Sequence, residues 1–536
     1  MSDPSLRDLM TNPLIAPSLK PALPKLFAGT LSSSLSGLSM LGALWCLVRL
    51  IGDISSDWVI AAVVLWITAA LFAAAASWLA HDAEAAFSGR LRRKVANHLI
   101  RLPATALSKQ SDQSLRNLVS SDIEKLHHMV AHLPSEVANF AILPLASITL
   151  LMSMVGPVAL WVLLPGIIAS LYYLVVVPHV SARDGAARMQ VMGEVISAVD
   201  DYARGIRVNR IYGRQSGALA AYHDSTKRFT DNMVMWVSKV ATLAGMAVAL
   251  LQAVTTFAIA YLVSYDHDAM TFAATLFFSL AIVTPVLRLG HGLDYVSTGR
   301  ASMGRLIALL QNPTVPTGHI TQLNSPTTLE IRDAELSIDD IQVINGLNHT
   351  FKADALTAIT GPSGAGKTTL LLILSGLEPL QAGSIQLAQV NISELDEQTR
   401  HQALLSIPQG GDVLPATVKE NLRLSSPNAT DEELTSALHK AQLTVELDSN
   451  AQTLSGGEQQ RVGIARVFLS SAPIILLDEP TAALDKIKAT KLIEELKHLA
   501  RNQHKTIIIV THDKTLAAIT DAQFELERKI DTENLS

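Results

Sequence analysis

The sequence predicts a helical membrane domain with six transmembrane helices, fused to an α/β domain. The chain has 536 residues, which is too long for one typical domain. Its composition is strongly apolar, with 49% hydrophobic and only 17% charged residues. Apolar runs long enough to cross a bilayer fill the first half, whereas short strand patterns alternate with helices in the second. The two halves are therefore expected to be chemically distinct domains.

Charge and cysteine content exclude several functions. The formal net charge is −6, so nothing global indicates binding to nucleic acid, and we expect no nucleic-acid partner. The single cysteine, Cys46, lies in an apolar run. An intramolecular disulfide and a cysteine-based metal site are both ruled out.

Residues 26–311 are predicted to form the six-span domain. A lead-in, residues 1–25, carries five prolines that prevent a long helix. The first apolar run has no small-residue cleavage pattern and is longer than the core of a signal peptide, so we predict that it is retained. Buried helices of a large soluble protein are the alternative, but each run has about the 20 residues that a bilayer requires. The predicted spans are 26–51, 58–80, 133–155, 157–177, 236–265 and 270–289.

The connections between the spans predict the orientation. The short connections, 52–57 and 266–269, contain acidic residues and no Lys or Arg. The long connections are basic, and the positive-inside rule places them and both termini in the cytoplasm. The basic residues are Arg90, Arg92, Arg93 and Lys94 after the second span, and Arg204, Arg207, Arg210 and Arg214 after the fourth.

Two groups of polar or kinking residues, one near the third span and one within the spans, can each be interpreted as functional or as structural. Glu124, His128 and His132 follow i, i+4, i+8 spacing, with His127 adjacent, which suggests a metal site. One helix rarely completes such a site, so we prefer polar residues approaching the third span. Other polar or kinking residues within spans either line a cavity or belong to interfacial belts and ordinary kinks. These are Tyr172, Tyr173, Gln252, Thr284 and Pro285.

A linker, residues 312–327, precedes the α/β domain, residues 328–528, and a polar tail, 529–536. Between an apolar strand pattern at 356–360 and a helical run stands GPSGAGKTT, which fits the P-loop pattern. In that pattern, backbone N–H groups at a helix N-terminus surround nucleotide phosphates, Lys367 neutralises them and Thr368 holds Mg²⁺. The sequence therefore predicts binding of ATP and Mg²⁺. The phosphate-binding residues are Gly361, Ser363, Gly364, Gly366, Lys367, Thr368 and Thr369.

Two further strands place candidate catalytic and metal-binding residues at the same edge of the predicted sheet. The apolar run 474–477 ends in Asp478 and Glu479. Asp478 is placed to bind Mg²⁺, and Glu479 to polarise the attacking water as a general base. A second strand, 506–510, is followed by His512, which is positioned to sense the γ-phosphate. The α/β domain is therefore predicted to hydrolyse ATP.

The segment LSGGEQQ supplies a second anion-binding helix start, formed by Ser455, Gly456, Gly457 and Glu458. With it, the sequence resembles the ATP-binding cassette family. The motifs occur in the family's order: GPSGAGKTT, Gln409, LSGGEQQ, IILLDEP, the tetrapeptide AALD at 482–485, and His512. The resemblance covers nearly the whole chain. It also assigns Gln409 to the catalytic residues and to the Mg²⁺ ligands.

The resemblance implies a half-transporter of the exporter architecture, a transport ATPase that needs a second subunit, identical or related. In the family's head-to-tail dimer, Ser455 and Gly457 cap the γ-phosphate held by Lys367 of the other subunit. Two features depart from the pattern. Ile338 stands where the family usually has an aromatic residue that stacks on adenine, and the segment between Gln409 and the signature is short.

Two cytoplasmic segments, 120–132 and 200–213, resemble siderophore importers with the exporter architecture. This resemblance implies import of a ferric siderophore or similar chelate across the inner membrane of a bacterium. Export of a lipid, peptide or drug-like compound is the alternative. A soluble cassette ATPase that binds nucleic acid or ribosomes would not need six spans. A nucleotide-gated channel would share every motif.

Overall fold

The computed structural model divides the chain into two units, Met1–Ala96 with Gln113–Gln311, and Asn97–Asp112 with Asn312–Ser536. The predicted domain boundaries stay a prediction. The structure describes residues 6–172, 175, 191–199, 201–203, 205–206, 210–211, 218–236, 238, 245, 249, 254–323, 328–339, 341–410 and 413–527.

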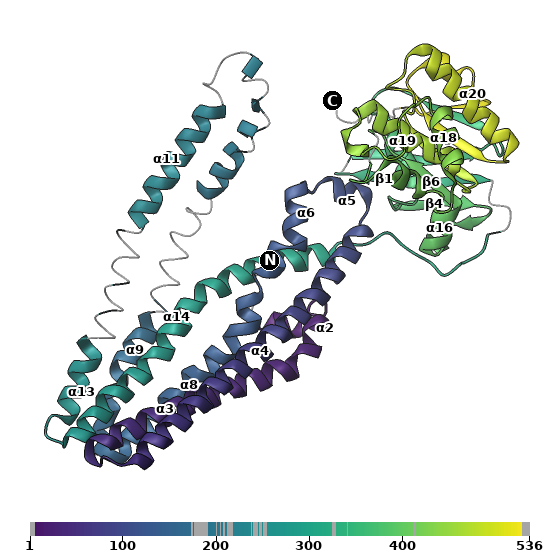
Figure 1. The fold of residues 1–536 in the computed structure, drawn as a ribbon. Helices are drawn as coiled ribbons and strands as arrows, with labels where there is room; N and C mark the ends of the chain where they lie inside the picture. The colour runs from purple at the N-terminus through teal and green to yellow at the C-terminus, as the bar shows by residue number, and fades with distance from the viewer. Residues whose placement is uncertain are drawn as a thin grey trace. The chain divides into compact units, whose positions relative to one another are not determined.

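The first unit is helical throughout its described residues. Short helices form the proline-containing lead-in, and long apolar helices follow (Figure 1). Its elements are α1 (Leu6–Thr11), α2 (Ala16–Leu19), η1 (Lys20–Ala22), α3 (Leu23–Gly52), α4 (Ser56–Ile100), α6 (Asp112–Val119), α7 (Ser121–Glu124), η2 (His128–His132), α8 (Leu133–Val155), η3 (Gly156–Leu163), α9 (Leu164–Leu171), α11 (Ala218–Trp236), α13 (Thr256–Ser264) and α14 (Ala269–Gln311).

The long helices bury small or apolar side chains against one another. Val48 of α3, Leu151 of α8 and Phe278 of α14 meet in one core cluster. Gly29 of α3 lies so close to α4 that an added Cβ would stand 3.3 Å from the carbonyl oxygen of Ala76. Small residues let membrane helices approach in this way. Many large apolar side chains of α4 point outward, as expected for a lipid-facing surface.

Four described helical stretches are long and apolar enough to cross a membrane: Ala16–Gly52, Ser56–Ile100, Asp112–Leu171 and Ala269–Gln311. They cover the predicted spans 26–51, 58–80, 133–155 and 270–289. The predicted span 157–177 starts as a 3₁₀ helix, η3, and continues as α9, because Pro157 and Pro165 limit regular α-helix here. Almost half of the predicted span 236–265 lies outside the described residues, and α13 forms most of its last part.

The second unit contains a parallel and an antiparallel sheet. The five parallel strands have the order β6-β7-β8-β3-β9, and the antiparallel sheet has the order β2-β1-β4-β5. The strands are β1 (Leu329–Ile338), β2 (Ile341–Phe351), β3 (Leu356–Thr360), β4 (Ala382–Leu387), β5 (Val390–Asn391), β6 (Leu404–Ile407), β7 (Ile474–Asp478), β8 (Thr506–Val510) and β9 (Ala522–Glu525). The helices are α5 (Ala104–Ser108), α15 (Lys367–Leu374), η7 (Ile392–Glu394), α16 (Glu397–Ala403), α17 (Val418–Arg423), α18 (Asp431–Lys440), η8 (Ala451–Thr453), α19 (Gly456–Leu469), α20 (Lys486–Asn502) and α21 (Lys514–Ala517).

The parallel sheet positions the residues that are predicted to bind and hydrolyse ATP. Its central strands β7 and β8 are buried along their whole length, as their continuous Ile, Leu and Val sequences predict. Four neighbouring strands, β6, β7, β8 and β3, end at the same edge, because all of them are parallel. In open α/β sheets ligands bind at this edge.

Candidate nucleotide site and membrane cavity

The loop after β3 has the backbone that a phosphate cradle requires. Gly361 has φ 144°, and a Cβ there would stand 2.4 Å from the carbonyl oxygen of Leu526. Gly366, with φ 87°, caps the N-terminus of α15. Larger residues cannot adopt these conformations without strain. The exposed loop residues Ser363 and Gly364 lie between them, and the first turn of α15 holds Lys367, Thr368 and Thr369.

Lys367 lies over this loop. Its Nζ donates hydrogen bonds to the carbonyl oxygens of Gly361, at 2.9 Å, and Pro362, at 2.8 Å. These contacts hold an ammonium group at the start of α15, where backbone N–H groups also favour an anion. The arrangement suits the binding of nucleotide phosphates.

Thr368 and Asp478 form a pair suited to Mg²⁺. Thr368 Oγ1 donates to Asp478 Oδ2 at 2.8 Å, and no described residue provides a hydrogen-bond partner for the buried Asp478 Oδ1. Burial raises the pKa of Asp478, and the charge of Glu479 acts in the same direction, while Thr368 and Lys367 oppose them. A buried carboxylate oxygen without a partner is a costly arrangement that a hard cation and its water shell would satisfy.

Three predicted catalytic side chains meet at the next positions along the edge. Gln409, after β6, donates from Nε2 to Glu479 Oε2 at 3.0 Å, and His512 Nδ1, after β8, lies 3.4 Å from Glu479 Oε1. Glu479 follows β7 directly. Its carboxylate is thus held between an amide and an imidazole, which is a suitable setting for a general base.

The backbone of Glu479 is itself constrained, which the sequence analysis did not detect. Glu479 has φ 46°, in the left-handed region. Its N–H donates to the carbonyl of Val510 at 3.1 Å, and its own carbonyl accepts a 2.9 Å bond from Gln460 Nε2. Gln460 is the last residue of LSGGEQQ and is buried in α19. A glutamine placed one helical turn after the signature glycines was the available signal.

The signature segment forms a separate helix start. Ser455 caps α19 in a capping box with Glu458, whose Oε2 accepts from Ser455 Oγ at 2.7 Å. Gly456 is exposed, and a Cβ at Gly457 would stand 3.0 Å from Ala483 Cβ. The bonds found for Ser455 and Glu458 in the described structure join them to each other rather than to the phosphate loop. This open helix start remains accessible to another molecule.

One of the two predicted departures from the family pattern, Ile338, can be located in the second unit. Ile338 ends β1 and lies half-buried against the apolar cluster that includes Ala365 of the phosphate loop.

A contact that the sequence does not predict lies at α5. Buried Glu378 accepts bonds from Thr105 N, at 3.0 Å, and Thr105 Oγ1, at 2.8 Å. Residues 97–112, which join two membrane-domain helices in the sequence, are therefore anchored on the ATP-binding fold.

The first unit contains a cavity of about 740 Å³, within the usual range for a small-molecule site. Thr284 and Pro285 line it, as one interpretation of the sequence predicted. Tyr172 packs instead beside the cluster around Val283. Tyr173 and Gln252 lie outside the described residues. Further polar lining residues are Ser36, His81, His132, Glu136, Asn139 and Arg288.

This combination of long apolar helices with a P-loop sheet defines a membrane-embedded, ATP-binding transport protein. Two family models match the chain: the ABC transporter transmembrane region over residues 26–286, and the ABC transporter family over 344–482. The chain belongs to the ABC transporters, with a transmembrane and an ATP-binding domain in one polypeptide. The family implies ATPase activity coupled to transport.

Similar proteins have the same two-domain organisation. The mycobactin import ATP-binding/permease protein IrtB of Mycolicibacterium thermoresistibile is 29% identical over 79% of this chain and 76% of its own length. A probable ABC transporter ATP-binding/permease protein of Haemophilus influenzae is 27% identical over 82% of both chains. The structure of a bacterial Atm1-family ABC exporter with ATP bound matches with a TM-score of 0.76 at 19% identity, over 95% of this chain and 94% of that chain. The last match shows that the fold is of the exporter type.

Proposed function

We propose that this protein is a half-transporter that couples ATP hydrolysis to the import of a ferric siderophore or a similar chelate. The observation that carries this proposal is the similarity to mycobactin import proteins, which extends over 79% of the chain rather than the ATP-binding domain alone. The cavity of about 740 Å³ in the membrane unit supports a small-molecule substrate.

The geometry supports a role for each residue in ATP hydrolysis. The phosphate loop, with Lys367, would bind the β- and γ-phosphates. Thr368, Asp478 and Gln409 would hold Mg²⁺, which neutralises charge on the phosphates. Glu479 would accept a proton from the attacking water. His512 would contact the γ-phosphate and, from its place beside Glu479 Oε1, keep that carboxylate oriented.

A second subunit would complete the site. Ser455 and Gly457 lie at an accessible helix N-terminus, which suits a phosphate bound elsewhere. The partner is a second copy of this chain or a related half-transporter. The basic long connections favour placing the ATP-binding domain and both termini in the cytoplasm, with the spans in the inner membrane of a bacterium.

The experiment is transport across proteoliposome membranes with the ATP-binding domains facing outward or inward in separate preparations. Import predicts that ferric siderophore leaves vesicles whose ATP-binding domains face outward and, with ATP inside, enters vesicles whose ATP-binding domains face inward. In both preparations the side of the ATP-binding domains corresponds to the cytoplasm. The Glu479→Gln variant should abolish the movement. ATP-driven movement of the chelate in the opposite direction, or of an amphipathic compound only, would decide for export.

Cells provide an independent test. Loss of the protein should remove siderophore-dependent iron accumulation, and wild-type protein should restore it whereas the Glu479→Gln variant should not. Intact iron accumulation together with hypersensitivity to an amphipathic toxin would contradict the import proposal.

A further inference from the structure

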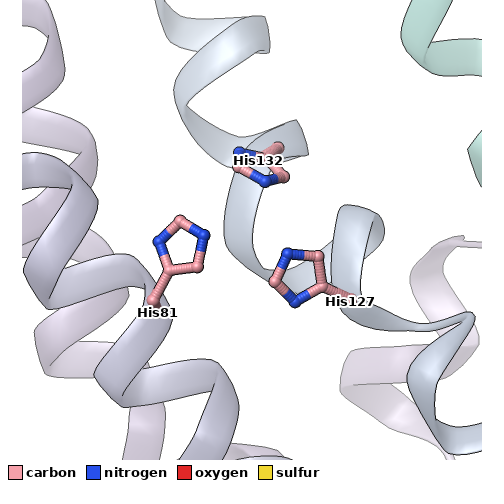
Figure 2. A group of neighbouring side chains, drawn as sticks. All are labelled: His81, His127 and His132. Carbon is pink, nitrogen blue, oxygen red and sulfur yellow. The ribbon is translucent and has the colours of Figure 1, made fainter.

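Three histidines from two separate elements meet in the first unit. His81 lies on α4, His127 directly precedes the π-helical turn η2, and His132 is the last residue of that turn (Figure 2). One potential ligand atom from each residue lies within 4.8 Å of the other two. The spacing of Glu124, His128 and His132 suggests a metal site on a single helix. In the structure, the three histidines that meet are His81, His127 and His132.

The π turn explains why i, i+4, i+8 spacing does not identify the histidines that meet. α7 ends at Glu124, and the N–H of Leu133 bonds to the carbonyl of His128, five residues back. A π turn carries more residues than an α turn, so His127 and His132 come to one side although they are five positions apart. Such single-turn insertions occur frequently at functional sites.

The three rings are spaced as zinc ligands are. Their centroids form a nearly equilateral triangle, with sides of 5.3, 5.2 and 5.2 Å. Zn–N bonds of about 2.0 Å at tetrahedral angles place imidazole centres roughly 5 Å apart. The ring planes are tilted by 48–75° to one another rather than stacked. The rings therefore surround a point, as Figure 2 shows.

Hydrogen bonds prepare two of these rings for a metal. His81 Nδ1 lies 2.8 Å from the carbonyl of Ser77, which only accepts, so Nδ1 carries the hydrogen and Nε2 keeps its lone pair. His127 Nδ1 lies 3.1 Å from Glu84 Oε2. Glu84 is fixed by Ser88, whose Oγ donates to Oε1 at 2.6 Å. Metal-binding histidines usually have such a partner on the nitrogen that does not bind the metal.

We propose that His81, His127 and His132 bind one Zn²⁺ ion, which joins α4 to the turn that begins α8. Imidazole nitrogens suit zinc, and three protein ligands leave the fourth position for water. Glu84 acts as the positioning residue for His127. Since His81 and His132 also line the cavity, the ion fixes part of the cavity wall.

The test uses the full-length, assembled protein without a histidine tag. After treatment with a chelator and addition of Zn²⁺ alone, desalted wild-type protein should retain one zinc per chain. His81→Ala, His127→Ala and His132→Ala should each lose most of it. Glu84→Gln should keep the site but weaken zinc affinity about 10- to 100-fold. His223→Ala, on α11, is the matched control and should bind as wild type does.

A spectroscopic measurement on wild-type protein decides the matter if a variant fails to fold. Co²⁺ in place of Zn²⁺ should give the strong visible absorption of a tetrahedral site with nitrogen ligands, and Zn²⁺ should displace it. No bound zinc at micromolar concentration, an octahedral Co²⁺ spectrum, or unchanged zinc content in all three histidine variants would overturn the proposal.

Discussion

Gln460 Nε2 donates a 2.9 Å hydrogen bond to the backbone carbonyl of Glu479, a residue held at φ 46°. The left-handed region costs a non-glycine residue roughly 1–2 kcal/mol, so neighbouring contacts must hold it there. Gln460 thus connects the helix of the signature motif to the proposed general base. Its amide is a positioning contact, since it touches the backbone of Glu479 rather than substrate.

We predict that Gln460→Ala lowers kcat of ATP hydrolysis about tenfold and changes ATP affinity little. Loss of a buried hydrogen bond costs about 1–2 kcal/mol. The same amount added to the activation free energy of hydrolysis lowers the rate about tenfold. Gln460→Glu keeps the shape but cannot donate, and should behave similarly. Gln503→Ala, at an exposed glutamine directly after α20, is the control. A loss of affinity or of thermal stability without a change in kcat would assign Gln460 a purely structural role.

Glu479→Gln should reduce turnover by roughly 10²–10⁴ while ATP binding persists, because the general base is lost and the phosphate loop is intact. A closed dimer should accumulate with ATP. Lys367→Ala should instead weaken binding. Steady-state hydrolysis and equilibrium nucleotide binding, measured with every site of the dimer mutated, distinguish the two effects. Near-normal hydrolysis in the Gln variant would remove Glu479 from this role.

The burial of Asp478 predicts a pH effect on Mg²⁺ binding. The pKa of Asp478 is raised by burial and by the Glu479 charge. Protons compete with the cation at this carboxylate, so Mg²⁺ affinity should fall, as pH decreases, at a higher pH than the ordinary aspartate pKa of about 3.9 implies. In the Glu479→Gln variant, Mg²⁺ affinity should fall at a lower pH than in the wild type, because the Glu479 charge no longer raises the pKa of Asp478.

Mg²⁺-dependent nucleotide binding across acid pH measures this shift without requiring hydrolysis. Asp431→Asn, on α18, changes an exposed carboxylate away from the site and serves as the control. Identical pH profiles for wild type and the Glu479→Gln protein would mean that the two carboxylates do not interact.

The sequence predicted best where local motifs determine the backbone. The phosphate loop needs glycines at fixed positions, and the apolar strands that precede Asp478 and His512 can only be buried, so their carboxyl ends meet at one edge. These constraints lie within a few residues of each functional side chain. Thus Glu479 and His512 were predicted at one edge from local patterns, and Gln409 was added by the resemblance to the family. The structure brings the three side chains together.

The sequence could not predict contacts that depend on tertiary packing. His81 lies far from His127 in sequence, and the π turn η2 changes which histidines share a side. The Gln460–Glu479 bond depends on the left-handed conformation of Glu479, which no local pattern demands. Neither spacing nor composition contains this information. Half of the segment 200–213, which carries part of the predicted resemblance, lies outside the described residues.

Anchoring of α5 by Glu378 predicts a coupling defect. Glu378 is buried and accepts both Thr105 bonds, so Glu378→Ala should leave two donors without partners, at about 1–3 kcal/mol. We expect basal ATP hydrolysis to remain while substrate-stimulated hydrolysis and transport fall severalfold or more. Lys109→Ala removes an exposed pair with Asp339 in the same region and should matter little, since such pairs contribute about 0–1 kcal/mol. Equal defects in both variants, or unchanged transport in Glu378→Ala, would contradict this role.

Ile338 predicts weak discrimination for adenine. It ends β1, pairs with Ile341 on β2, and packs beside the cluster that contains Ala365 of the phosphate loop. An aliphatic side chain there forgoes base stacking, which contributes about 1–3 kcal/mol on the aromatic platforms that bind nucleic-acid bases. Ile338→Tyr should therefore lower the Michaelis constant for ATP about tenfold and widen the difference between ATP and GTP. Ile341→Tyr, at the paired position, adds the same ring to an exposed site and should change neither. If Ile338→Tyr has no effect and Ile341→Tyr does, the base stacks at the start of β2 rather than at the end of β1.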